Sequence, residues 1–383
     1  MFISTLLLII GSITLYWLHN QYHLDVALEE TEPPENAPLI SVCVPARNEA
    51  RNIRRCVDAL LAQDYPNFEV IVLDDRSTDG TAKMLDELSH VDDRLKVING
   101  VELPLGWAGK PHALLQASGV ARGEWLCFVD ADTFPAPNTL SAVYAKATET
   151  EADFFTIFTH QEMETFWERT ILPLVLTALS VGFPPKKVND PKSKVAIANG
   201  QFIFIKRNIY DALGGHGAVK ASIAEDKDLA VLTKSSGYRL IVGDGSGFVR
   251  TRMYTSLPEM WEGWTKNIYL GLRDDPKLAV LGIFGAFLAL SAALVMPVWT
   301  GIGVYLTVTS GSQESIVILV TSLLLWGSLV DWRIQANKAM DVPIWYAITA
   351  PLGAGVFAAM MFASAFKVIS GKGVVWKGRR YRR

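Results

Sequence analysis

The sequence predicts an α/β domain with a mostly parallel sheet, placed between an N-terminal anchor helix and a C-terminal transmembrane helical region. Three observations lead to this fold class. Strand-like apolar runs alternate with helix-like runs between about residues 39 and 150, and polar residues follow each strand-like run. Long apolar runs without charge lie near both ends of the chain. Alternating strands and helices are typical of a parallel sheet with helices on both faces.

Four charge-free apolar runs predict the membrane segments. They cover residues 2–18, 278–309, 316–330 and 342–366. About 20 apolar residues span a bilayer, so the second and fourth runs are long enough to cross it, and the third is shorter. The first run has no basic start and no small-residue cleavage site after it. We therefore expect an uncleaved anchor over residues 1–20 instead of a signal peptide.

Composition narrows the function of the part between these runs. The formal net charge is −3, which gives no indication of a nucleic-acid partner. Cys43 and Cys127 lie inside strand-like apolar runs, where a cysteine usually serves as a small buried hydrophobe. No disulfide or zinc framework is visible among the three cysteines, which fits a cytosolic domain.

The elements of the predicted domain follow a linker. Residues 21–38 contain the acidic, proline-rich stretch "EETEPPENAP", which predicts a linker before a domain over residues 39–255. Strands are then expected at 39–46, 68–75, 94–99 and 124–132, and helices at 49–62, 80–88, 111–120 and from about Asn138. In sheets of this kind, ligands bind beyond the carboxyl ends of the strands.

The four predicted strand ends all carry polar residues. In chain order they read "PARNE", "DDRSTDG", "GKPH" and "DAD". Each one alone has a simpler explanation, because a DD pair before Ser-Thr-Asp-Gly is often a turn with a helix cap. A single Asp-x-Asp is most often a solvated loop. Four such loops on one edge of a sheet instead favour a binding site.

Together these motifs resemble a known family. "PARNE", "LDDRSTDGT", "GKPHAL" and "FVDAD", in this order and strand context, resemble the inverting glycosyltransferases of family 2, which have the Rossmann-like GT-A fold. The resemblance covers about residues 39–254. It implies a nucleotide-sugar donor, with a UDP-sugar favoured, and Mg²⁺ or Mn²⁺ as the cofactor.

A divalent cation would explain the paired aspartates. Two like charges 4 Å apart cost about 4 kcal/mol at an effective dielectric constant near 20, so carboxylates alone would repel a diphosphate. A bridging metal reverses this interaction. By resemblance, Asp132 is the main metal ligand, and Asp130 faces the metal through water or the donor ribose. The expected nucleotide-sugar site consists of Pro45, Asn48, Glu49, Asp74, Asp75, Lys110 and Asp130.

The acceptor side needs a base, because the attacking hydroxyl must lose its proton. "ASIAEDKDLA" places Glu225 and Asp226 at the start of a helical pattern, and this matches the Glu-Asp motif of the family. The resemblance implies that Asp226 is the base and that Glu225 orients it. The alternative is that both only complement the helix dipole. The preceding Asn199, Gly200 and Gln201 are expected to line the sugar site.

The sequence departs from the family in a predicted interfacial helix at residues 256–275. Many processive members carry Gln-x-x-Arg-Trp there, whereas this chain reads "MWEGWTKNIY". Trp264 matches the tryptophan, but Gly263 replaces the arginine. Lys266 or Arg252 would supply the lost charge. This version resembles bacterial glycosyltransferases that act on carotenoid or other polyisoprenoid lipids, and it argues against a long polymer.

Two apolar features indicate an interface with lipid. Trp261, Trp264 and Ile268 share one helix face, which predicts either core packing or an interfacial position, and we include Trp261 in the acceptor region. The run at residues 171–183 is too short to span a bilayer. We expect it to be a second interfacial segment, near the entry of a lipid acceptor.

Sugar nucleotides are cytosolic, so the catalytic domain should face the cytosol from a multi-pass protein of the plasma membrane. The basic tail at residues 372–383 should also be cytosolic, which requires an even number of crossings within residues 276–371. Either residues 278–309 form two helices broken near Pro297, or residues 342–366 form a hairpin near Pro351. Lys377, Arg379 and Arg380 would bind lipid headgroups or reach the active site.

The sequence therefore predicts an enzyme that transfers one sugar from a nucleotide donor to a lipid hydroxyl or carboxyl, with inversion. The alternatives are a short-chain polysaccharide synthase and a membrane scaffold whose domain only binds nucleotide. A transporter is disfavoured, because the apolar runs lack the paired charges that line transport paths.

Overall fold

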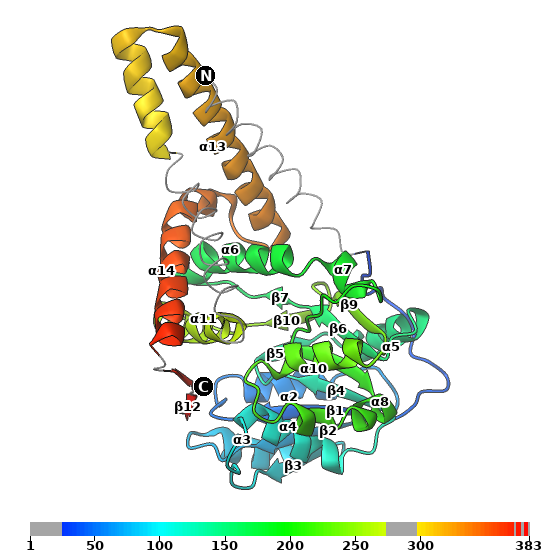
Figure 1. Cartoon of the computed structure of the whole chain (residues 1–383). Helices are drawn as coiled ribbons and strands as arrows, with labels where there is room; N and C mark the ends of the chain where they lie inside the picture. The colour runs from blue at the N-terminus through cyan, green and yellow to red at the C-terminus, as the bar shows by residue number, and fades with distance from the viewer. Residues whose placement is uncertain (1–24, 273–296, 371–372, 377–378, 382–383) are drawn as a thin grey trace. The chain divides into compact units, whose positions relative to one another are not determined.

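The computed structural model describes residues 25–272, 297–370, 373–376 and 379–381 (Figure 1). Contacts divide the chain into two units. Of the described residues, the sheet unit contains 25–162 and Phe183–Met253, and the helical unit contains Met163–Gly182 and those from Tyr254 onward. The predicted anchor and most of the run at residues 278–309 lie outside the described residues.

A seven-stranded sheet forms the centre of the sheet unit. Its first four strands are parallel, β8 is antiparallel to both of its neighbours, and β9 is parallel to β6. The predicted mostly parallel sheet is therefore confirmed. In order across the sheet, the strands are β3 (Leu95–Asn99), β2 (Phe68–Asp74), β1 (Ile40–Ala46), β4 (Trp125–Val129), β8 (Phe202–Lys206), β6 (Phe154–Phe158) and β9 (Leu240–Asp244).

Two apolar cores cover the two faces of this sheet. Side chains alternate along a strand, so in β1 Val42 and Val44 belong to one core and Cys43 to the other. The first core is packed by α2 (Ile53–Leu61), α3 (Thr81–Ser89) and α5 (Thr139–Glu149). The second is packed by α4 (Gly109–Val120), α7 (Pro185–Asn189), α8 (Arg207–Ala212) and α10 (Glu225–Ser235). The buried, unpaired cysteines agree with the prediction from composition.

Two further features close the sheet unit. A small sheet of β5 (Thr133–Pro135), β10 (Val249–Thr251) and β7 (His160–Gln161) lies beyond the carboxyl end of β4. The predicted linker also joins the fold, because Ala27 forms a parallel bridge with Asp244 at the edge strand β9. Such pairing protects an exposed strand edge.

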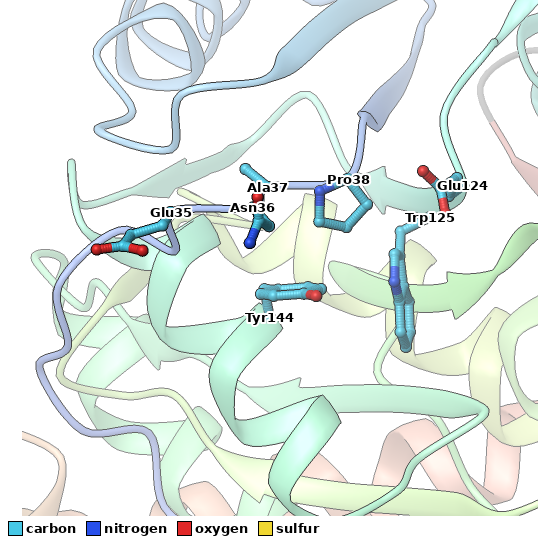
Figure 2. A pocket seen from close by; sticks show the side chains of 7 residues that line it. All are labelled: Glu35, Asn36, Ala37, Pro38, Glu124, Trp125 and Tyr144. Atoms are coloured by element: carbon cyan, nitrogen blue, oxygen red, sulfur yellow. The ribbon is translucent and has the colours of Figure 1, made fainter.

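An open hollow lies at the amino end of β4 (Figure 2). The linker and the start of the strand line it, with Glu35, Pro38, Glu124, Trp125 and Tyr144 among its residues. It is thus at the opposite end of β4 from the aspartates that the sequence singled out.

The described part of the helical unit contains apolar helices and one short 3₁₀ helix. The helices are α6 (Phe166–Gly182), α11 (Leu257–Leu272), a helix over residues 297–310, α13 (Gln313–Ala339) and α14 (Ala350–Ile369), and the 3₁₀ helix (Ile344–Thr349) directly precedes α14. Gln313–Ala339 and Ile344–Ile369 are long and apolar enough to cross a membrane, each with a mean hydropathy of 1.8 in its best window. Strands β11 (Val374–Trp376) and β12 (Arg379–Tyr381) pair in the tail.

The structure removes one of the two arrangements left open for the crossings. Helix α14 begins at Ala350 and includes Pro351 in its first turn, where a proline is well tolerated. It then continues without a break to Ile369. A hairpin near Pro351 is therefore wrong. A break near Pro297 falls at the border of the described residues and stays a prediction.

Helix α6 contains Pro173, whose missing N–H leaves the carbonyl of Arg169 without its usual helical donor. Arg333, buried on α13, donates from Nη2 to the carbonyl oxygens of Arg169 at 2.8 Å and Thr170 at 3.3 Å. The proline in α6 is thus compensated by a side chain from a candidate membrane-spanning helix, and the two helices are tied together.

Candidate active site

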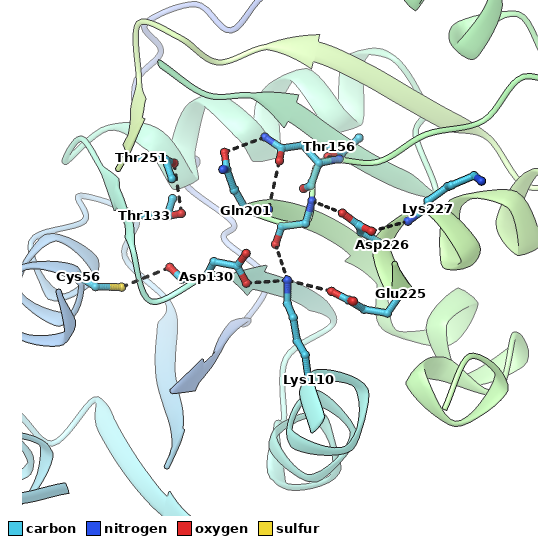
Figure 3. Close-up of polar contacts among 12 residues, drawn as sticks. Cys56, Lys110, Asp130, Thr133, Thr156, Gln201, Glu225, Asp226, Lys227 and Thr251 are labelled. Atoms are coloured by element: carbon cyan, nitrogen blue, oxygen red, sulfur yellow. Dashed lines mark hydrogen bonds and ion pairs between the residues drawn. The ribbon is translucent and has the colours of Figure 1, made fainter. Parts of the chain in front are cut away.

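Lys110 lies at the centre of a charged cluster at the carboxyl edge of the sheet (Figure 3). Its ammonium nitrogen is 2.7 Å from Asp130 Oδ1 and 2.8 Å from Glu225 Oε1, and it also lies 3.4 Å from the carbonyl oxygen of Gly200. Four segments supply these groups: the start of α4, the residue after β4, the loop before β8 and the start of α10. The structure thus brings together residues that are 115 positions apart in the chain, as Lys110 and Glu225 show.

Asp226 is fixed next to this cluster by two backbone donors. Its Oδ2 accepts from the Gly200 N–H at 2.9 Å, and its Oδ1 accepts from the Lys227 N–H at 2.8 Å. A Cβ at position 200 would lie 2.7 Å from Asp226 Oδ2 and 3.1 Å from the Lys110 nitrogen. Glycine is therefore required at position 200 for this approach.

The pKa values of the two acidic residues at the start of α10 shift in opposite directions. Burial alone would raise the pKa of Glu225, but the Lys110 ammonium outweighs it and lowers that pKa. Burial and the neighbouring Glu225 charge raise the pKa of Asp226 to about 6. Burial would lower the pKa of Lys110, but Asp130, Glu225 and Asp226 together raise it. Lys110 therefore stays charged, and Asp226 can take up a proton near neutral pH.

A simpler explanation for Glu225 and Asp226 is that they only complement the helix dipole. Both residues do lie in the first turn of α10, where a negative charge is favourable. Asp228 lies in the same turn. Of these acids, Glu225 forms an ion pair with Lys110 at 2.8 Å, and Asp226 accepts a bond from the Gly200 N–H at 2.9 Å. The dipole explains the acidity of the turn but not these contacts.

Asp130 and Asp132 follow β4 in a turn closed by the Thr133 N–H bonding to the Asp130 carbonyl oxygen. The Asp130 side chain turns toward Lys110, and the Asp132 carbonyl oxygen accepts from the N–H of Arg252 at 3.2 Å. Within the described residues, no group of three or more histidine, cysteine or acidic side chains could hold a metal. Two carboxylates fit a cation that takes its other ligands from water and substrate phosphates, as Mg²⁺ usually does.

The expected nucleoside loops are tied to each other. Asn48 has a positive φ of 55°, its side-chain oxygen accepts from the Thr78 N–H at 2.8 Å, and its own N–H donates to Ser77 Oγ at 2.9 Å. The N–H of Glu49 donates to Thr81 Oγ1 at 2.8 Å. The loops after β1 and β2 therefore form one surface, although residues from the two loops are about thirty positions apart.

The aspartates after β2 are both buried, and each has an internal contact. Asp74 Oδ1 accepts from the Ser77 N–H at 3.3 Å. Arg47 donates to the Asp75 carbonyl oxygen at 2.6 Å, and its guanidinium lies 3.9 Å from the Asp75 carboxylate. Pro45 precedes this arginine in β1 and pairs with Leu73. Arg47 belongs to the motif "PARNE", but its contact with Asp75 could not be predicted from the motif.

The residues expected to line the sugar site, Asn199 and Gln201, belong to a network of amide hydrogen bonds. Gln201 Oε1 accepts from Thr159 Oγ1, from Gln161 Nε2 at 2.9 Å and from Asn199 Nδ2 at 3.3 Å. Three donors on the oxygen fix the orientation of the Gln201 amide. Asn199 and Gln201 were predicted, whereas Thr159 and Gln161 were not, because neither lies in a recognisable motif.

Arginines gather beside the small sheet. Arg55 binds Glu162 through two contacts of 2.7 and 2.8 Å, and this pairing lowers the pKa of Glu162, with further contributions from Arg250 and Arg252. Arg252 therefore contributes positive charge to this side of the sheet unit, near the backbone of Asp132.

The remaining predicted residues belong to the helical unit. Trp264 is buried on α11 with its ring 6.2 Å from that of Tyr254, while Trp261 and Lys266 are half-buried. A Cβ at Gly263 would overlap the Tyr254 ring. The missing arginine thus has a packing reason, because the Tyr254 ring occupies the space that a side chain would need. The structure places these α11 residues in a different unit from Lys110 and Asp226.

Comparisons with known proteins agree with this fold. Residues 41–214 match the family model of glycosyl transferase family 2. Glycosyltransferase GlyG of Streptococcus pneumoniae serotype 4 is 33% identical over 115 residues, which are 30% of this chain and 37% of that protein. The 4,4'-diaponeurosporenoate glycosyltransferase of Staphylococcus aureus is 29% identical over 261 residues, which are 66% of this chain and 67% of that enzyme.

One solved structure has a fold similar to that of this chain. Mannosyltransferase PcManGT from Pyrobaculum calidifontis, in complex with GDP-Man and Mn²⁺, aligns over 94% of both chains with a TM-score of 0.54 and 18% identity. The family model thus matches residues 41–214, and the likeness to the solved mannosyltransferase shows the fold. Together with the named relatives, this match supports a glycosyltransferase, and the chain resembles the Staphylococcus aureus diaponeurosporenoate glycosyltransferase, as the sequence motifs predicted.

Proposed function

We propose that the protein transfers a single sugar from a nucleoside-diphosphate donor to a membrane lipid, with inversion at the anomeric carbon and with Asp226 as the general base. The observation that carries this proposal is the cluster of Lys110, Asp130, Glu225 and Asp226. In this cluster Lys110 forms ion pairs with Asp130 and Glu225, whereas the pKa of Asp226 is raised to about 6. A base with a pKa near the operating pH is suited to remove a proton from a hydroxyl.

The chain's own residues then have distinct roles. Lys110 stays cationic and lies where it can approach a donor phosphate while it holds Glu225 ionised. Asp226, held by the Gly200 N–H, accepts the proton of the acceptor hydroxyl. Asn48, Glu49 and Asp75 line the nucleoside side, and Asn199 and Gln201 face the sugar.

A divalent cation, when bound with the donor, would offset the charge of the leaving diphosphate. Asp132 and Asp130 are the side chains that would hold it. Lys110 already neutralises one oxygen of Asp130, so we assign the larger share of the binding to Asp132. The archaeal mannosyltransferase with the same fold was solved with Mn²⁺ and GDP-Man. We expect Mg²⁺ or Mn²⁺ here and place UDP-sugars first among the donors to test, with GDP-mannose second.

A lipid acceptor is supported by the helical unit and by one relative. Two helices of this unit are candidate membrane spans, and apolar residues such as Val308, Leu324 and Ile348 are exposed on its helices. The Staphylococcus aureus relative is named for an apolar carotenoid acid, which suggests a lipid carboxyl or hydroxyl as the acceptor here. We further propose that the protein is multi-pass, with the sheet unit in the cytosol.

The proposal is tested with the full chain in lipid vesicles, a labelled nucleotide sugar and extracted bacterial lipids. Asp226→Asn should keep donor affinity but lose transfer by roughly 10²–10⁴-fold, as expected for loss of a general base. Asp228→Asn is the matched control, because it removes an acid from the same helical turn and should retain transfer. Equal losses in the two variants would indicate a dipole effect and contradict the base assignment. A chain that binds nucleotide without transferring sugar would be a scaffold.

A further inference from the structure

His216 is buried behind the charged cluster, in a segment that the proposed mechanism does not use. It lies in α9 (Gly215–Ala218) and is fully buried. Gly214 and Gly215 precede it with φ angles of 80° and 52°, and a Cβ at Gly215 would be 2.5 Å from the ring of Tyr210. The two glycines therefore let the backbone wrap tightly around this ring and carry the imidazole inside.

A line of hydroxyl groups connects His216 to α4. Tyr210 Oη lies 2.8 Å from His216 Nδ1 and 3.0 Å from Ser118 Oγ, and it accepts from the His216 backbone N–H at 3.1 Å. Ser118 Oγ lies 3.0 Å from the Leu115 carbonyl oxygen, to which it donates. Serine has one hydroxyl hydrogen, so Ser118 must accept from Tyr210. The tyrosine hydrogen is then used, and His216 must donate from Nδ1.

This proton count leaves His216 Nε2 as an acceptor. Burial lowers the pKa of His216 to about 4, so the imidazole is neutral at physiological pH. Nε2 is enclosed and has no hydrogen-bond partner within the part of the chain that the structure describes. Buried polar atoms without a partner are uncommon in folded proteins, and they call for an explanation.

The surroundings of the imidazole connect it to the cluster. Helix α9 packs against α4, which carries Lys110, and against α10, which carries Glu225. The charges that act on the imidazole are those of Glu225 and Lys110. From β4, the Phe128 ring meets it edge-on at 4.8 Å, and from α8 it faces the Tyr210 hydroxyl. A neutral group therefore fills the space behind a paired cation and anion.

We infer that His216 is a positioning residue, which through Tyr210 and Ser118 fixes the distance between α4 and α10 so that Lys110 pairs with Glu225 and leaves Asp226 as the base. The inference rests on the proposed role of Asp226. A protonated residue at position 216 would compete with Lys110 for Glu225. An apolar residue of similar size would leave the Tyr210 hydroxyl without its imidazole partner, and α9 would keep only the bond from its backbone N–H to α8.

Two variants and one control test this in the full chain in lipid. His216→Leu and Tyr210→Phe should lower kcat by roughly tenfold or more, since small displacements of catalytic groups are costly, while the KM for the donor changes little. In both variants, the fall of kcat at low pH should begin at a higher pH. The Lys110 charge lowers the pKa of Asp226, and a displaced Lys110 would lower it less. His216→Asn, whose amide can still donate to Tyr210, should recover most of both effects. His90→Leu, at an exposed histidine directly after α3, should change neither.

A spectroscopic measurement separates this inference from the proposed function, because it needs no turnover. With ¹⁵N-labelled histidine in the full chain, the imidazole signal that disappears in His216→Asn should show the Nδ1–H tautomer and stay neutral to about pH 5, well below the usual histidine pKa. It should shift in Glu225→Gln. An imidazole with the other tautomer, an ordinary titration, or no response to Glu225→Gln would overturn the inference. Variants that lose activity only in proportion to folded protein, with an unmoved acid limb, would do the same.

Discussion

At the scale of single residues, the proposed role of Asp226 as the base predicts that its protonation sets the pH range of activity. Its pKa is raised to about 6, first by burial and then by the Glu225 charge. The base works only when ionised, so kcat should be level above this pH and fall about tenfold per unit below it. The limb belongs to the coupled pair of Glu225 and Asp226. The check is kcat against pH at saturating donor, and a limb near the ordinary aspartate value of about 4 would contradict it.

Gly200 should be essential for catalysis but not for folding. In Gly200→Ala the new methyl would lie 2.7 Å from Asp226 Oδ2, and the carboxylate, as the end of a side chain, can rotate away. The protein should therefore fold normally while transfer falls by roughly 10²-fold, because the base is misplaced. Gly247→Ala is the control, since a Cβ there meets nothing within 4 Å. Thermal unfolding and initial rates of both variants are the measurements.

Metal dependence should rest on Asp132. Asp132→Asn removes a ligand but little volume, so transfer should be lost while the unfolding midpoint stays close to that of the wild type. Excess chelator should have the same effect on the wild type, and Mn²⁺ or Mg²⁺ should restore it. Full activity in chelator, or full activity of Asp132→Asn, would remove the metal from the mechanism.

The sequence predicted the charged residues of the cluster around Lys110, but it did not predict residues such as Arg47 and His216. Lys110, Asp130, Glu225 and Asp226 lie at predicted strand ends or helix starts, where parallel topology collects them. Arg47 and His216 gave no such signal. Their roles depend on partners such as Asp75, 28 positions from Arg47, and these contacts exist only after the strands align in register.

At the scale of elements, periodicity predicted the first four strands and the helices between them, with errors at their ends. The fourth strand was expected to reach residue 132, but β4 ends at Val129 because the aspartates form a turn. The first helix of the domain was expected from residue 49, but α2 begins at Ile53 because the Glu49 N–H bonds instead to Thr81 at the start of α3. Both differences fall where backbone groups serve the site instead of the regular element.

Helix α11 shows a packing constraint that the sequence did not reveal. Gly263→Ala would place a methyl group against the Tyr254 ring, and overpacking of this kind costs about 1–3 kcal/mol. Gly327→Ala on α13 is the matched control, because a Cβ there meets nothing within 4 Å and alanine favours a helix by about 0.5–1 kcal/mol. Thermal unfolding in detergent should show the first variant less stable and the second at least as stable as the wild type. If Gly263→Ala had the unfolding midpoint of the wild type, the Tyr254 ring could move aside without loss of stability, and the packing argument would be wrong.

At the scale of the whole molecule, composition predicted a sheet domain and a C-terminal helical region, but not how the chain divides between them. Met163–Gly182 belongs to the helical unit although the sheet unit resumes at Phe183. Hydropathy could not show this, because the run at residues 171–183 is apolar but too short to span a bilayer. Its assignment depends on packing against α14 and on the bond from Arg333 to the carbonyl of Arg169.

The last prediction concerns the length of the product. A processive enzyme must hold a growing polar chain along a polar track, usually lined by charge, hydroxyls and stacked aromatics. Between Ile316 and Trp326, helix α13 exposes aliphatic side chains such as Val320, Leu323 and Leu324, together with the Trp326 ring. Such surfaces are suited to lipid contact. An apolar acceptor would stay in the leaflet and present only its head to Asp226.

The product should therefore remain in the membrane with one sugar attached. Purified full chain in lipid, a labelled nucleotide sugar and native lipids should give an organic-soluble species whose mass rises by one fixed increment. The chain length should not grow with longer incubation, because the aliphatic surface of α13 between Ile316 and Trp326 is not suited to hold a polar product for a second round. The control is Asp226→Asn, which should leave the label in the nucleotide. Label that accumulates in a water-soluble polymer would instead identify a polysaccharide synthase.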